Sequence, residues 1–124
     1  MASIKRFEEI IAWQKARILC NEIDMLISNS NLSKDYKLKE QINGSSGSIM
    51  DNIAEGFGRY HYQENIQFCR IARGSLNEAL NQVITALDDN YIEEDLLQKF
   101  RERFERTKAI LNGYINYLAR TKME

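Results

Sequence analysis

The residues that could do chemistry in this chain of 124 residues are few and widely spaced. His61 is the only histidine, and it lies between two tyrosines in a predicted loop. A nucleophile assisted by histidine would have this one base, and the sequence contains no Gly-rich phosphate loop, no GxSxG motif and no His/Cys/Asp set at metal-ligand spacing. We therefore expect no catalytic residue, no metal and no cofactor, and interpret His61 as a surface residue.

A second group of polar side chains has helical spacing. Asn52, Glu55 and Arg59 lie at positions i, i+3 and i+7, so they share one helical face. If that face is buried, the Glu55 carboxylate must be paired or must take up a proton. Arg73 is the natural partner, because a short turn between antiparallel helices brings residues equidistant from it together. We interpret the four as a structural polar cluster, a buried ion-pair lock on helix register; a polar site for a ligand or partner is the alternative.

Basic residues cluster once, near the C-terminus. Lys99, Arg103 and Arg106 lie at i, i+4 and i+7 on the edge of a predicted helix, and are the candidate nucleic-acid-binding residues. The alternative is a solvated helix face with charge pairs, since Glu102 and Glu105 lie among them. In an oligomer such a patch repeats, and several copies can engage one polyanion with increased avidity.

Composition limits the classes of function. The formal net charge is −1 and the estimated pI is about 5.9, which argues against coating nucleic acid through bulk positive charge. Cys20 and Cys69 fall on or beside apolar helical faces and are interpreted as small buried hydrophobic residues. No apolar run approaches the roughly 20 residues of a membrane span, and the N-terminus lacks a signal core. We expect a soluble, cytoplasmic protein with no membrane partner.

The elements that position these residues are predicted to be four long helices. Proline is absent, and polar stretches interrupt the apolar periodicity at three places. The expected helices cover about 9–28, 34–56, 63–89 and 93–121. The fold class is therefore all-α, with residues 1–124 forming a single antiparallel up-and-down four-helix bundle.

The stretch Gln41–Arg59 organises the predicted bundle. Its apolar residues return at helical spacing with small residues between them, as expected for close contact with a second helix. Gly44 and Gly47 each cost about 1 kcal/mol relative to alanine in a helix, which predicts tight packing around them. Gly56 and Gly58 are expected to supply positive φ angles at the helix end. The seam comprises Ile42, Ser45, Ser46, Ile49 and Ile53.

Three further expectations concern neighbouring segments. The third helix also has a seam of small residues, so it is predicted to pack closely against the second, with room at Gly74. Ser33 is the candidate N-cap of the second helix. Trp13 is expected in the core, whereas the apolar lead-in either folds over a bundle end or faces another subunit. That lead-in contains Ile4, Phe7, Ile10 and Ile11, and the exposed aromatic residues are expected to be Phe57, Tyr60 and Tyr62.

The ordered motifs resemble a known family. Trp13-Gln14-Lys15-Ala16, then Asn52-Ile53-Ala54-Glu55-Gly56 with Arg59, then Ile71-Ala72-Arg73-Gly74-Ser75-Leu76 with Glu78 are similar to the four-helix-bundle proteins of the 23S rRNA intervening-sequence family. The resemblance runs over about three quarters of the chain. It implies an up-and-down bundle, a homopentamer and no enzymatic activity.

The resemblance also suggests partners. Related accessory proteins of diversity-generating retroelements bind nucleic acid and a reverse transcriptase, so RNA, DNA or a reverse-transcriptase-like protein is the implied partner. Family members commonly carry a basic pair where this chain has Asn43 and Gly44. If that pair contacts nucleic acid, part of the surface is missing here. We therefore predict a non-enzymatic oligomeric scaffold that engages structured RNA; a structural or protein-interaction oligomer without nucleic-acid affinity is the alternative.

Overall fold

The computed structural model describes residues 3–123, and four long helices account for most of them. Two short 3₁₀ helices, η1 and η2, precede α1 and α2, and the sequence did not indicate either. The elements in order are η1 (Phe7–Glu9), α1 (Ile11–Ser28), η2 (Asn31–Lys34), α2 (Tyr36–Gly58), α3 (Tyr62–Asp88) and α4 (Glu94–Met123).

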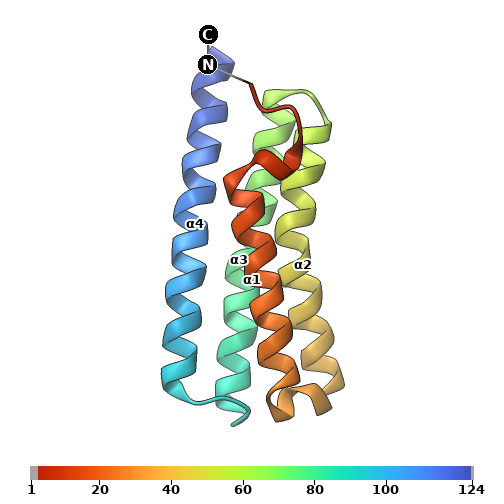
Figure 1. Ribbon diagram of the computed structural model, residues 1–124, viewed down its shortest axis with the longest axis vertical. Helices are drawn as coiled ribbons and strands as arrows, with labels where there is room; N and C mark the ends of the chain where they lie inside the picture. Colours follow the sequence, from red (N-terminus) through yellow and green to blue (C-terminus); the bar gives the residue numbers. More distant parts are fainter. Residues whose placement is uncertain (1–2, 124) are drawn as a thin grey trace.

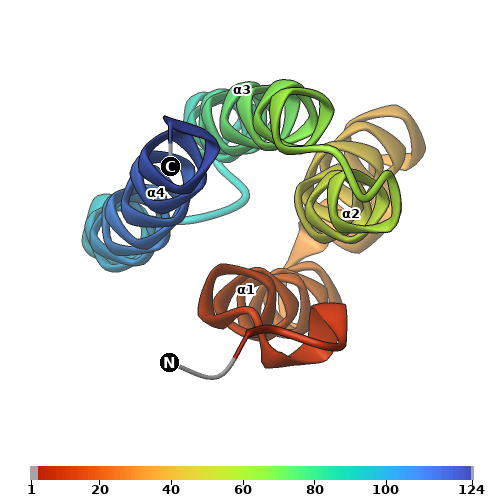
Figure 2. The ribbon, with the colours of Figure 1, turned by 90° about the horizontal axis from the view of Figure 1, so that it is seen from above.

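The helices run up and down in one antiparallel bundle. Figure 1 shows the start of α1 and the end of α4 at the same end of the molecule. Seen along the axis, the helices follow one another around the bundle in chain order (Figure 2). The described residues contain no strand, so the predicted all-α four-helix bundle is confirmed.

The most extensive helix contact joins α2 and α3, as the small residues of both seams predict. Ile42, Ile49 and Ile53 are fully buried, and each such side chain stabilises the fold by roughly 1.5–3 kcal/mol. Hydroxyl groups also cross this interface: Ser45 Oγ lies 2.6 Å from Gln82 Oε1, to which it donates. Small side chains thus let the two helices approach, and their polar atoms are hydrogen-bonded across the seam.

The prediction of close packing around three helical glycines is wrong. A Cβ atom built on Gly44, Gly47 or Gly74 would have no heavy atom within 4 Å, so none of the three lies at a close contact. Gly56 does, because its Cβ would lie 2.7 Å from Asn65 Oδ1 and 2.9 Å from Phe68 Cβ. Among the glycines of α2 and α3, the one at a close contact between the helices is therefore Gly56, next to the turn that joins them.

The helix ends differ from the sequence-based expectations at two places. Asp35, not Ser33, caps α2: its Oδ1 accepts a hydrogen bond of 3.1 Å from the Leu38 amide. No glycine in the described residues has a positive φ, and α2 continues through Gly58. The left-handed position at its end is instead Tyr60, with φ of 55°. A non-glycine residue there costs roughly 1–2 kcal/mol of backbone strain.

The lead-in folds back over the bundle. Ile10 is buried, and Phe7 contacts the edge of Trp13 with ring centroids 5.2 Å apart. Trp13 is itself buried, as predicted, and Arg17 lies over its ring at 5.7 Å. Ile11, however, is 54% exposed. The lead-in therefore covers a bundle end and also leaves two large apolar side chains exposed, Ile11 and, to a smaller extent, Phe7 at 37%.

Candidate nucleic-acid interface

The structure separates the four residues of the predicted polar cluster. Glu55 and Arg59 form an ion pair of 2.9 Å at the end of α2, with side chains 54% and 47% exposed. Arg73 instead donates from its guanidinium to Asn112 Oδ1 in α4, at 2.9 Å. The predicted buried ion-pair lock is therefore wrong. Water reaches the Glu55 carboxylate, so it needs no buried cation.

Asn52 has a different role from the one predicted. It donates from Nδ2 to the Ser48 carbonyl at 2.7 Å and to Ser48 Oγ at 2.8 Å. The same Ser48 hydroxyl accepts a hydrogen bond of 3.0 Å from Ser75 in α3. Asn52 thus orients the Ser48 hydroxyl, which joins α2 to α3. These hydrogen bonds are between neutral groups, whereas the sequence had suggested an ion pair.

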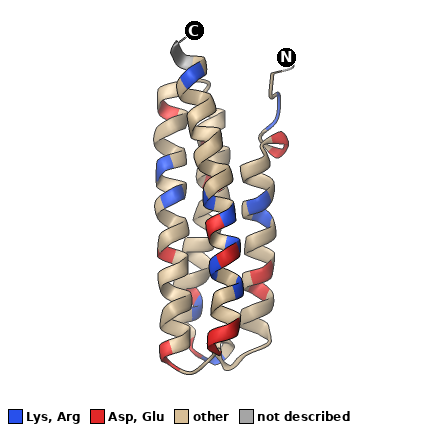
Figure 3. Cartoon of the chain, turned by 90° about the vertical axis from the view of Figure 1, so that its left-hand side faces the viewer, with Lys and Arg blue, Asp and Glu red and all other residues tan. Residues whose placement is uncertain are grey.

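The candidate basic residues of α4 have unequal environments. Lys99 and Arg106 are exposed, whereas Arg103 forms an ion pair with Glu22 of α1. The Arg103 guanidinium also lies 5.4 Å from the centroid of the Phe100 ring. Figure 3 shows acidic residues interleaved with the basic ones along α4, so the helix has no uniformly basic face. Arg103 is held in place and partly neutralised, while Lys99 and Arg106 are open to solvent.

A shallow hollow between α1 and α4 brings two of the three candidates together. Arg103 and Arg106 line it with Lys15 of α1, and Glu22 is the only carboxylate among its described lining residues. Lys99 does not line it. Sequence reasoning missed Lys15, because spacing within one helix does not reveal which residues of another helix lie beside it. The three cations against one carboxylate leave a local positive excess that the net charge conceals.

Large apolar side chains continue along the same junction. Ile11, Ile18 and Met25 recur every seventh residue on α1 and are 54%, 48% and 64% exposed. Each lines one of three successive hollows at the junction of α1 and α4, which we call the α1/α4 groove. The opposite wall repeats every seven residues as Leu96, Arg103, Ile110 and Tyr117. The seven-residue spacing of the α1 stripe is a sequence signal that could have found this groove.

The two cysteine thiols are in environments that do not activate them. Burial raises the pKa of the Cys69 thiol to about 12, and this thiol donates to Asn65 Oδ1 at 3.6 Å. Burial also raises the pKa of Cys20, which is partly exposed and donates to the Ser46 carbonyl at 3.1 Å. Both cysteines therefore stay protonated at neutral pH. His61 is exposed and occupies the N-cap position of α3.

Two kinds of feature are absent from the described residues. No group of three or more His, Cys, Asp or Glu side chains within them is placed to hold a metal ion. None of their helices combines the length and apolar character needed to cross a membrane.

The bundle and its groove define the class of protein: an antiparallel four-helix bundle with an apolar groove between its first and last helices. The middle hollow of the groove is basic, and the other two hollows include the carboxylates Glu9, Glu93 and Asp95. Residues 8–113 match the sequence profile of the 23S rRNA-intervening sequence protein family, and the chain belongs to that family. This finding confirms the resemblance on which the sequence analysis relied. No curated protein sequence matches the chain.

The fold is similar to that of a solved structure. That structure is of a protein with unknown function from the S23 ribosomal protein family of Bacteroides thetaiotaomicron, which is 18% identical to this chain. The alignment covers 86% of this chain and 96% of that chain, with a TM-score of 0.74. At this identity the likeness shows the fold. Neither this structure nor the family profile indicates an enzyme family.

Proposed function

We propose that this protein is a non-enzymatic, homo-oligomeric binding scaffold that engages structured RNA or DNA through basic side chains repeated by assembly. The observation that carries the proposal is the α1/α4 groove, where exposed apolar residues lie beside Lys15, Arg103 and Arg106. Apolar side chains favour contact with another protein surface, and clustered cations favour phosphate. One surface of the bundle thus supplies both features that an oligomeric nucleic-acid scaffold requires.

Assembly is supported by the exposed stripe on α1. Three large apolar side chains in a row with heptad spacing are costly to leave in water, and a helix from a second copy would cover them. The resemblance to the family suggests a pentamer. In a ring, the cations that remain outside the subunit contacts recur in each protomer and act together on one polyanion.

The nucleic-acid part of the proposal depends on few cations. Arg103 is fixed by Glu22, so it is pre-oriented, while Lys15 and Arg106 are exposed. Asn43 and Gly44, which replace the basic pair common in the family, are exposed on α2 and add no charge there. We therefore expect modest affinity per protomer, and a steep fall of the oligomer's affinity with salt, since the phosphate contacts of all copies add.

A second candidate is an oligomer that binds a protein, such as a reverse-transcriptase-like enzyme, and has no nucleic-acid affinity. The pairing of Arg103 with Glu22 favours it, because one of the three cations is then partly neutralised. The acidic pI of about 5.9 also favours it.

The experiment is a binding titration of the purified oligomer with a structured fragment of 23S rRNA and a matched DNA duplex, from low to physiological salt. Light scattering in the same buffer follows the oligomer mass. Arg103→Glu/Arg106→Glu should weaken binding at least tenfold at unchanged mass. Lys99→Glu/Arg106→Glu repeats the test without disturbing Glu22.

A control variant, Lys34→Glu/Arg70→Glu, makes the same change of net charge at exposed residues outside the groove. It should leave binding within about twofold of the unmodified protein. The reason is that phosphates are positioned by the basic residues of the groove and not by the net charge of the protein. Absence of binding at low salt to either nucleic acid would reject the first candidate and favour the protein partner.

A further inference from the structure

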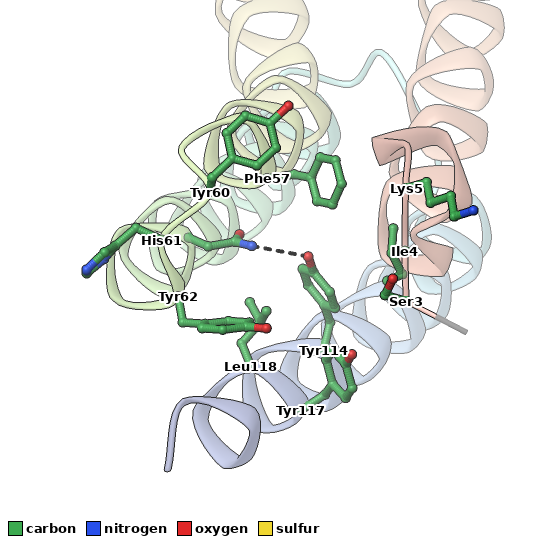
Figure 4. A pocket seen from close by; sticks show the side chains of 11 residues that line it. Ser3, Ile4, Lys5, Phe57, Tyr60, His61, Tyr62, Tyr114, Tyr117 and Leu118 are labelled. Atoms are coloured by element: carbon green, nitrogen blue, oxygen red, sulfur yellow. Dashed lines mark hydrogen bonds between the residues drawn. The ribbon is translucent and has the colours of Figure 1, made fainter. Parts of the chain in front are cut away.

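A pocket lined by aromatic rings lies at the end of the bundle that carries the α2–α3 link. Its volume is about 440 Å³, within the roughly 300–1,000 Å³ of small-molecule sites. Figure 4 shows rings contributed by the end of α2, the link, the start of α3 and the last part of α4, with residues 3–5 opposite. We call it the aromatic pocket, and its rings are Phe57, Tyr60, Tyr62, Tyr114 and Tyr117.

The rings present π faces in several orientations. Tyr114 and Tyr117 stack on each other with centroids 6.3 Å apart and ring planes 17° from parallel. Phe57 and Tyr60 lie 6.4 Å apart and are tilted by 52°. Tyr60 and Tyr62 are 90% and 47% exposed, as predicted, whereas Phe57, also predicted to be exposed, is partly buried against the core. Such exposure is unusual for large aromatic side chains that have no partner to bind. The pocket therefore offers flat, accessible surfaces for a planar ligand.

A hydrogen-bonded pair, Asn65 and Tyr114, is among the polar residues that line the pocket. The buried amide of Asn65 donates to the Tyr114 hydroxyl at 3.3 Å, and the bond is drawn in Figure 4. Burial raises the pKa of Tyr114 to about 12, so the hydroxyl keeps its proton at neutral pH. Its oxygen accepts from Asn65, and its own O–H is left to donate. A ligand acceptor atom in the pocket can therefore be recognised by a fixed donor.

The rim carries the Lys5 ammonium, and the Glu9 carboxylate lies beside this residue, accepting from the Lys5 backbone amide at 2.9 Å. Lys5 and His61 lie on opposite sides of the pocket and point away from its centre (Figure 4). No Asp or Glu occurs among the described residues that line it. A cationic ligand would meet the Lys5 ammonium, whereas an anionic group at the rim would be attracted. The pocket thus combines stacking surfaces, a hydrogen-bond donor and an ammonium group at its edge.

We propose that the aromatic pocket binds one unpaired nucleotide of a single-stranded nucleic acid, with the base stacked on tyrosine rings and the phosphate near Lys5. This inference rests on the proposed function and deepens it, because it names unpaired bases as the element recognised. Stacking on aromatic side chains is a general means of binding single strands, since every base has a π face. A base-paired duplex cannot offer a base to the pocket.

The test uses the full-length oligomer and two probes. The first is a fluorescent 12-nucleotide single strand, compared with a duplex of the same length by anisotropy. Tyr60→Asn/Tyr62→Leu removes two exposed rings, and asparagine tolerates the left-handed backbone at position 60. We expect single-strand affinity to fall about tenfold or more, as for loss of one stacked base, with duplex affinity unchanged.

The second probe is adenosine 5′-monophosphate, detected by saturation-transfer NMR, with inorganic phosphate as competitor. The base protons should receive saturation from the protein, and phosphate alone should not displace the nucleotide. Tyr36→Leu is the matched control, because Tyr36 is 73% exposed and lies at the opposite end of α2. It should change neither readout. Tyr114→Phe keeps the ring and should weaken nucleotide binding through loss of the O–H donor.

The four outcomes separate the two proposals. Single-strand binding that is lost in the tyrosine double variant, together with a nucleotide signal, supports both. Single-strand binding that survives the double variant, without a nucleotide signal, overturns the pocket assignment and leaves the scaffold function standing. A nucleotide signal without binding of either nucleic acid supports the pocket and overturns the scaffold function. Failure of both probes overturns the pocket assignment, and it overturns the scaffold function as well only when the duplex and the structured rRNA fragment also fail to bind.

Discussion

A Cβ atom on Gly56 would lie 2.7 Å from Oδ1 of Asn65, so α2 and α3 meet with no room for a methyl group at this point. The same Asn65 donates from its amide to Tyr114 in α4. Gly56 therefore sets the position of a residue that joins three helices. The neighbouring obstacle, Phe68 Cβ at 2.9 Å, is fixed to the backbone and cannot rotate away.

Gly56→Ala should lower the free energy of unfolding by about 1–3 kcal/mol, the usual cost of adding a methyl group to a filled interior. Gly47→Ala is the matched control, because open space surrounds that position. It should raise the free energy of unfolding by about 0.5–1 kcal/mol through better helix propensity. Urea unfolding followed by circular dichroism measures both. Equal stability of the two variants would contradict a close contact at Gly56.

Glu55→Ala should cost less than about 1 kcal/mol, because its ion pair with Arg59 is half exposed to water. Asn52→Ala should cost more, about 1–2 kcal/mol, since it removes the amide that orients Ser48 at the α2–α3 interface. Urea unfolding of the two single variants and the wild type gives the comparison. A decrease of several kcal/mol in the free energy of unfolding on Glu55→Ala would instead support the buried ion-pair lock.

The sequence was sufficient for the fold and for the α2–α3 seam, because both depend on periodicity within single helices. Ser45, Ile49 and Ile53 are buried where their spacing predicted. The polar cluster failed for the opposite reason: which α3 face meets α2 depends on helix rotation, and Arg73 is turned toward Asn112 in α4. The hollow beside Arg106 likewise needs Lys15 of α1, which no pattern within α4 identifies.

The stability contributed by Asp35, the N-cap of α2, should depend on pH. Tyr91 Oη lies 2.8 Å from Asp35 Oδ2, and this bond, followed by the Leu38 amide, lowers the pKa of the Asp35 carboxyl. A lowered folded-state pKa stabilises the fold above the unfolded value of about 3.9, and the contribution is lost as pH falls through the folded value. The same bond raises the pKa of Tyr91, so its contribution is lost as pH rises through that raised value, above 10.0.

Tyr91→Phe should therefore move the Asp35 pKa upward toward its ordinary value, as measured by ¹³C NMR titration of the carboxyl carbon. It should also weaken the dependence of stability on acid pH. Tyr36→Phe is the control, since its hydroxyl makes no hydrogen bond to Asp35 in the described part of the chain. An unchanged Asp35 titration in Tyr91→Phe would mean that the Leu38 amide alone sets it.

The α1 stripe gives the most direct test of assembly. Ile18→Glu/Met25→Glu places charges at two side chains that are 48% and 64% exposed, so the protomer should keep its helical content. If these residues meet another copy, the buried charges cost several kcal/mol per interface, and the oligomer should dissociate to smaller species in light scattering. Ile71→Glu is the matched control, because Ile71 is 52% exposed on α3, away from the groove.

The oligomer masses of the wild type and of the two variants distinguish the possible subunit contacts. Dissociation of the α1 variant alone assigns the subunit contact to the α1/α4 groove, whose middle hollow Ile18 lines together with Lys15 and Arg106. Dissociation by Ile71→Glu alone moves the contact to α3, which would leave the groove exposed in the oligomer and free to receive a partner. A wild-type protein that is monomeric at micromolar concentration would contradict the assembly, and with it the avidity on which nucleic-acid binding by so few cations depends.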